Sequence, residues 1–166
     1  TNLILGSSFV SRFQKDNNPK FNLPQNVGVY GLRSNLISGN FNYYLEYVHK
    51  YNDPAGSIAD NSNNYATGNA IKTSLTYFQK GLGFSFDAHR VDNMEFRSER
   101  QQSKEYIINY IPTLSKQHSY TLLAFYPCAT QSNGEIGFQS DLYYKFDRGT
   151  ISVSYTHLTL PTTHCV

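Results

Sequence analysis

The stretch that decides the fold is NAIKTSLTYFQKGLGFSFDAHRVD, residues 69–92. Apolar and polar residues alternate on both sides of a Lys-Gly step at 80–81, a pattern typical of β-strands with one apolar and one polar face. The stretch therefore predicts a hairpin closed by a two-residue turn, in which every pair stays on its own face. This register pairs Tyr77 with Phe84, Leu75 with Phe86, Ser74 with Asp87, Lys72 with His89, and Phe78 with Gly83, where a ring can cover a bare glycine.

The same alternation extends to both sides of the hairpin. It predicts strands at about 3–14, 25–37, 41–51, 105–111, 120–126 and 135–146, and one that starts at Ile151. Tight turns at 38–40, 79–82 and 147–149 alternate with long polar connections at 15–24, 52–67 and 92–104, and two connections of medium length, 112–118 and 127–134, precede the last turn. In an antiparallel meander, this order places all the long connections at one end of the sheet.

Short turns at one end, long loops at the other and amphipathic strands are typical of outer-membrane barrels. Aromatic residues also gather beside the tight turns, as at a membrane interface. The predicted fold class is all-β: an antiparallel up-and-down meander of about eight or nine strands, an open fragment of a transmembrane β-barrel in residues 1–152. A soluble antiparallel sheet or sandwich, with one face in its core and the other in water, is the alternative.

The polar face is the main functional lead. Its charged residues are predicted to line the lumen of the barrel, where mixed signs suit a narrow aqueous path or a self-neutralising plug. The tight turn before residue 41 sets Arg33 directly across from Glu46. The predicted lumen residues are Arg12, Arg33, Glu46, Lys50, Lys72, Asp87, His89, Asp141 and Lys145.

Composition excludes several classes of function. The net charge is +2, and no basic run stands out, so no nucleic-acid partner is expected. Only 16% of the residues are charged, whereas Tyr and Phe supply the whole of a 15% aromatic share. No apolar run approaches the ~20 residues of a membrane-spanning helix, and no signal peptide is visible. Because Thr1 is not a natural start, we expect a cut N-terminus.

The last stretch, VSYTHLTLPTTHCV at residues 153–166, resembles translated sequencing-adapter read-through. We therefore expect a non-native tail. Cys165 would then not be biological, and Cys128 would be left as the one genuine cysteine. A genuine last strand ended by Pro161 is the alternative.

Residues 68–146 resemble an uncharacterised outer-membrane β-barrel family of Bacteroidota, filed as a domain of unknown function. The resemblance rests on GNAIKTSLTYFQKGLGFSFDAHRVDNMEFRSER (68–100), INYIPTLSKQHSY (108–120) and GEIGFQSDLYY (134–144). It implies location in the outer membrane and contact with outer-membrane lipid. Members of that family are longer, so this chain is expected to be a fragment. The family has no activity that transfers a catalytic residue.

No enzyme chemistry is predicted from these residues. Ser85, Asp87 and His89 have the residue types of a triad but lie two apart on one strand, so their side chains run parallel. Oxygens of Asp53 and of polar residues at 60–64 could meet Ca²⁺, but a polar loop is the preferred interpretation. The expectation is no metal, no cofactor and no catalytic site. An outer-membrane lipase or protease remains an alternative if missing strands carry the site.

The long connection after the hairpin carries charges of both signs. We expect them in a solvated extracellular loop, where they could meet a small solute or a surface protein. These loop candidates are Glu95, Arg97, Glu99 and Arg100.

Overall fold

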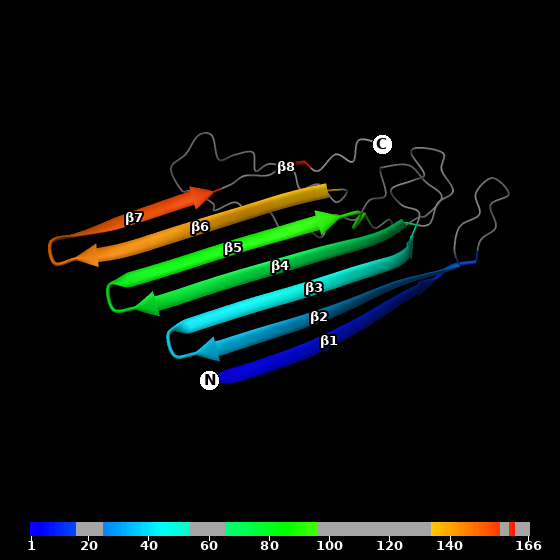
Figure 1. Ribbon diagram of the computed structural model, residues 1–166, viewed down its shortest axis with the longest axis horizontal. Coiled ribbons are helices and arrows are strands. Elements are labelled where there is room, and N and C mark those ends of the chain that lie inside the picture. The colour runs from blue at the N-terminus through cyan, green and yellow to red at the C-terminus, as the bar shows by residue number, and fades with distance from the viewer. Residues whose placement is uncertain (16–24, 54–65, 96–133, 157–159, 162–166) are drawn as a thin grey trace.

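The computed structural model describes residues 1–15, 25–53, 66–95, 134–156 and 160–161. The strands are β1 (Asn2–Phe13), β2 (Asn26–Ser38), β3 (Phe41–Asp53), β4 (Ala66–Gln79), β5 (Leu82–Asp92), β6 (Gly134–Phe146), β7 (Gly149–Thr156) and β8 (Leu160–Pro161). The strands β1 to β7 pair in chain order in one sheet, all antiparallel, and β8 pairs with β6. Figure 1 shows this open sheet. The predicted all-β antiparallel meander is confirmed.

The predicted hairpin registers are also observed. In β4 and β5, Tyr77 lies opposite Phe84 and Phe78 opposite Gly83, and the ring of Phe78 comes within 3.4 Å of a Cβ built on that glycine. Gly81 supports the turn with a φ of 82°, a conformation that costs glycine little. The β2–β3 turn likewise uses Gly39, at φ 55°.

The strand beside β5 differs from the expected one. The predicted strands 105–111 and 120–126 lie outside the described residues, and β6 pairs with β5 along its length, from Leu82 opposite Tyr144 to Asp92 opposite Gly134. The expectation that residues 105–111 would follow the hairpin in the sheet is therefore wrong. An antiparallel neighbour only has to re-enter the sheet at the end where the previous strand left it. The length of the connection 93–133 therefore does not decide which strand pairs with β5.

The connections now alternate without exception. Segments 14–25, 54–65 and 93–133 join strands at one end of the sheet, and two-residue turns at 39–40, 80–81 and 147–148 join them at the other (Figure 1). Backbone hydrogen bonds connect each tight turn to the next hairpin. The Phe78 amide donates to the Asn40 carbonyl at 3.1 Å. The Lys145 amide does the same to the Gly81 carbonyl at 2.8 Å.

The tight turns step steadily in one direction. Phe41, at the end of the first hairpin, lies opposite Tyr77, and the second hairpin continues for two more residues to Gln79. Leu82 lies opposite Tyr144, and the third hairpin again continues for two residues, to Phe146. Figure 1 shows the resulting staircase of turns. A stagger of one residue per strand corresponds to a strand tilt of about 35°, from a rise of ~3.3 Å and a strand spacing of ~4.8 Å.

The register sorts the side chains into an apolar face and a polar face. We call the side that carries Leu75 and Phe86 the apolar face, and the side that carries Lys72 and His89 the polar face. All eight described strands belong to the one sheet, so none of them forms a second layer over the apolar face. Exposed large hydrophobic side chains on that face include Leu3, Leu5, Phe9, Phe13, Leu32, Phe41, Ile71, Leu142, Phe146, Ile151 and Val153.

The buried hydrophobic side chains lie away from the apolar face. Among the described residues, the buried hydrophobic side chains are Val27, Val91 and Met94. Val27 and Val91 belong to the polar face, near the long connections. The segment 153–166 contributes the end of β7 and the short β8.

Candidate functional site

The nine predicted lumen residues share one face of the sheet. Successive registers place them all on the polar face, although they come from six strands. Period-two alternation on each strand, combined with in-register turns, is sufficient to bring them together. These residues are Arg12, Arg33, Glu46, Lys50, Lys72, Asp87, His89, Asp141 and Lys145.

Four of these residues form one row across neighbouring strands. Arg33 lies opposite Glu46, Glu46 opposite Lys72, and Lys72 opposite His89. Glu46 therefore has a cation on each neighbouring strand at cross-strand distance, and opposite charges in these positions favour the pairing. We call this set the charged row.

The charged row is supported by its neighbours. The Arg33 side chain lies across Gly6 of β1, so close that a Cβ built there would stand 2.5 Å from Nε. Glu46 accepts a hydrogen bond of 2.7 Å from the hydroxyl of Tyr44 on the same strand. Gly6 thus leaves room for the Arg33 side chain, and the Tyr44 hydroxyl orients the Glu46 carboxylate.

At its β5 end the charged row leads into a buried pair, formed by His89 and Glu135. His89 Nε2 and Glu135 Oε1 are 2.9 Å apart, and both side chains are about 5% exposed. Glu135 lies opposite Val91, one step diagonal to His89 on the same face. Glu135 is not among the site residues predicted from the sequence, because strand alternation does not show that β6 pairs with β5. Only that pairing brings the carboxylate to the histidine.

A second buried contact closes the same end of the polar face. Lys50 is fully buried, and its Nζ donates a 2.6 Å hydrogen bond to the backbone carbonyl of Glu95. Glu95 is itself only 4% exposed. The expectation that Glu95 belongs to a solvated loop is therefore wrong, because the chain folds inward immediately after β5. Arg97, Glu99 and Arg100 lie outside the described residues.

Ser85 and His89, which have residue types of a catalytic triad, form hydrogen bonds with different carboxylates. Ser85 Oγ donates to Asp141 Oδ2 at 3.4 Å, a carboxylate that also accepts from Gln139 at 3.0 Å. His89 contacts Glu135 instead. Within the described ranges, no group of three or more His, Cys, Asp or Glu side chains is placed to hold a metal ion. The calcium alternative at 60–64 lies outside the described residues.

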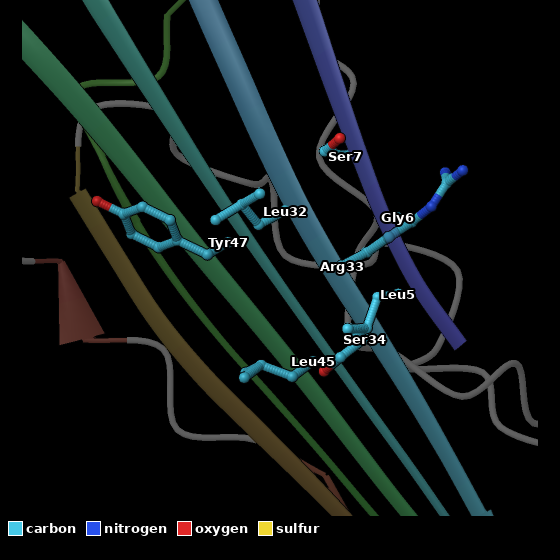
Figure 2. A pocket seen from close by; sticks show the side chains of 8 residues that line it. All are labelled: Leu5, Gly6, Ser7, Leu32, Arg33, Ser34, Leu45 and Tyr47. Carbon is cyan, nitrogen blue, oxygen red and sulfur yellow. The ribbon is translucent and has the colours of Figure 1, made fainter. Parts of the chain in front are cut away.

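The apolar face carries a shallow depression of about 510 Å³ over β1, β2 and β3. It is lined by Leu5, Gly6, Ser7, Leu32, Arg33, Ser34, Leu45 and Tyr47. Figure 2 shows the leucines and Tyr47 around it, with Arg33 reaching past β1 at Gly6. Small Ser7 and Ser34 side chains between leucines create the depression.

Aromatic contacts flank this face at both ends. At the tight-turn end, Phe41 and Tyr77 pack with ring centres 4.6 Å apart. Toward the long connections, Tyr30 contacts Tyr47 at 6.4 Å. Ten residue-to-residue steps along β3 lead from Phe41 to Tyr51, whose ring lies over Gly28. At a strand tilt of about 35°, this span is about 27 Å along the direction perpendicular to the line of tight turns.

Comparisons with known proteins yield one match. A family model described as "Family of unknown function (DUF6029)" matches residues 1–164. No curated protein and no solved structure matches the chain. In the described residues there is no helix long and apolar enough to cross a membrane.

Proposed function

This chain belongs to the family of unknown function DUF6029, and we propose that it is part of a bacterial outer-membrane β-barrel. Its apolar face contacts lipid, and its polar face lines an aqueous interior that passes or binds a small solute. The role is non-enzymatic. Only the resemblance noted in the sequence points to Bacteroidota as the source.

The observation that carries the proposal is the bare apolar face. Large side chains such as Leu5, at 72% exposed, and Phe9, at 62%, extend over a sheet of seven strands. A soluble protein rarely leaves a contiguous apolar patch of more than a few hundred Å² exposed. Lipid is the solvent that makes such a face favourable.

Three geometric features support the same environment. The uniform stagger implies a tilt of about 35°, at the lower bound of the 35–45° typical of barrels. Phe41 and Tyr51, near the two ends of β3, are separated by a height close to the ~25 Å apolar belt of outer-membrane barrels. In addition, strands of 11 to 14 residues in β2–β6 are long enough to cross at that tilt.

The test uses two adjacent positions that point to opposite faces. The chain has no Trp, so Leu142→Trp on the apolar face and Tyr143→Trp on the polar face each introduce a single fluorophore. In vesicles that contain lipid brominated on the acyl chains, we expect strong quenching of the tryptophan at 142 and little at 143.

The two variants control for each other, because they differ by one residue and share one strand. Equal quenching, or quenching at position 143 only, would contradict the assignment of the faces. A chain that stays in the aqueous phase without vesicles and shows no quenching at all would favour the soluble binding module.

A further inference from the structure

The chain turns across the polar face as soon as β5 ends. Asn93 has a positive φ of 46°, and its side-chain amide donates to the Thr67 carbonyl at 3.1 Å. Gly68 lies on the polar face opposite Lys50. A Cβ built on Gly68 would clash with the backbone carbonyl of Asn93, which shows that the chain lies directly over this glycine.

Burial and a hydrogen bond from Lys50 keep residues 93–95 in this position. Met94 is 3% exposed and Glu95 4% exposed. The Lys50 ammonium, with no exposed surface, donates to the Glu95 carbonyl at 2.6 Å. A lysine is rarely buried without a strong acceptor, since desolvation of the ammonium is costly. The lysine and the carbonyl therefore hold each other in place.

We infer that residues Asn93–Glu95 form a constriction strap across the polar face, fastened by Lys50 and seated on Gly68. This inference rests on the proposed function, because it makes the strap the element that limits the size of the solute in the aqueous interior. The buried His89–Glu135 pair joins β5, from which the strap begins, to β6 on the same face of the sheet.

The sequence shows why the strap forms at this point. Asn is among the few non-glycine residues that adopt a positive φ readily, so the turn inward occurs at position 93. Gly68 removes the side chain that would block the crossing. Met94 supplies an unbranched apolar side chain that fills an irregular space.

The first measurement tests the strap without reference to transport. In the full chain with Cys128→Ser and Cys165→Ser, Met94→Cys introduces one thiol. It is reacted with a bulky maleimide in detergent micelles, where both ends of the barrel are accessible. We expect slow labelling, and a rise of about tenfold or more when Lys50→Met or Gly68→Ala is added. A shift of ~1.4 kcal/mol in strap opening changes the rate tenfold in this regime.

Matched variants control for charge and for side-chain addition. Lys80→Met also removes a lysine, from the exposed 80–81 turn, and Gly149→Ala adds a methyl group where nothing lies within 4 Å. Both should leave labelling unchanged. Heat-modifiable mobility on gels checks that each variant is folded. Unchanged labelling in folded Lys50→Met and Gly68→Ala proteins would overturn the strap.

The second measurement tests the constriction. Proteoliposomes are swollen with uncharged sugars of graded size, and the two strap variants should admit the larger sugars severalfold faster than Lys80→Met and Gly149→Ala. Faster labelling with unchanged size dependence would overturn the role of the strap as a constriction. If no protein admits any sugar, passage itself is wrong, and the labelling still decides whether the strap exists.

Discussion

At the residue scale, the polar face depends on which side chains meet across strands. His89 and Lys72 could be paired from the hairpin alone, because a two-residue turn determines the register. The contact of His89 with Glu135 follows from the β5–β6 pairing instead. The two contacts of one residue therefore come from different levels of structure.

The His89–Glu135 pair should contribute measurably to stability. We expect His89→Ala to lower the free energy of unfolding by about 2–3 kcal/mol, because it leaves a buried carboxylate without this partner. Ser85→Ala removes a longer and less buried contact to Asp141, and should cost ~1 kcal/mol or less. Denaturant unfolding in lipid vesicles measures both values.

A double-mutant cycle completes this prediction. If the pair interacts directly, His89→Ala combined with Glu135→Gln should cost less than the sum of the two single changes. Strict additivity would mean that the 2.9 Å contact contributes nothing to stability.

Glycines and their covering side chains are also decided at this scale. The ring of Phe78 over Gly83 could be predicted, since the register places an aromatic opposite a bare glycine. The crossing of the chain over Gly68 could not, because it depends on where the chain goes after β5 ends.

At the element scale, each strand is an amphipathic ribbon whose two faces meet different surroundings. Leu45 on β3 and Ser74 on β4 illustrate this, since the first lies on the apolar face and the second on the polar face. The one-residue stagger between neighbouring strands turns these ribbons into a tilted sheet. Tilt and stagger are linked in barrels, so the register itself carries information on the architecture.

A charge placed on the two faces should have unequal effects. Leu45→Arg puts a guanidinium on the apolar face, between Phe41 and Tyr51 of β3, and should destabilise the folded protein in vesicles by about 2–4 kcal/mol. Ser74→Arg lies opposite Asp87 on the polar face and should change stability by ~0.5 kcal/mol or less. The comparison is made by titration with denaturant under identical conditions.

The outcome has a clear alternative. A larger loss from Ser74→Arg than from Leu45→Arg would mean that the polar face, rather than the apolar face, is the one out of contact with water.

At the scale of the whole molecule, the long connections gather at one end and the tight turns at the other (Figure 1). Outer-membrane barrels place their longer loops outside the cell and their short turns in the periplasm. The proposed function therefore implies one orientation for the chain.

Orientation can be mapped in intact cells that carry the full-length protein. Protease added from outside should cut within 54–65 and 96–133 and spare the turns 39–40, 80–81 and 147–148. Permeabilised cells serve as the control, because the turns are then reachable from both sides. Cleavage of the turns in intact cells, or recovery of the protein in the soluble fraction, would contradict the outer-membrane assignment.

The sequence by itself determined the local parts of this protein. Alternation with a period of two decided which residues share a face, and two-residue turns decided the registers of β2–β3 and β4–β5, because both depend only on residues close together in the chain. The nine charged residues of the polar face were recognisable for the same reason.

Only the tertiary structure decided which residues far apart in the sequence come into contact. It pairs β6 with β5, which brings Glu135 into contact with His89. It also places residues 93–95 over Gly68, where Lys50 donates a hydrogen bond to the Glu95 carbonyl. These contacts depend on the path that the chain takes between strands. No periodicity encodes that path, since any strand that re-enters at the correct end with matching faces can pair with the free edge of β5.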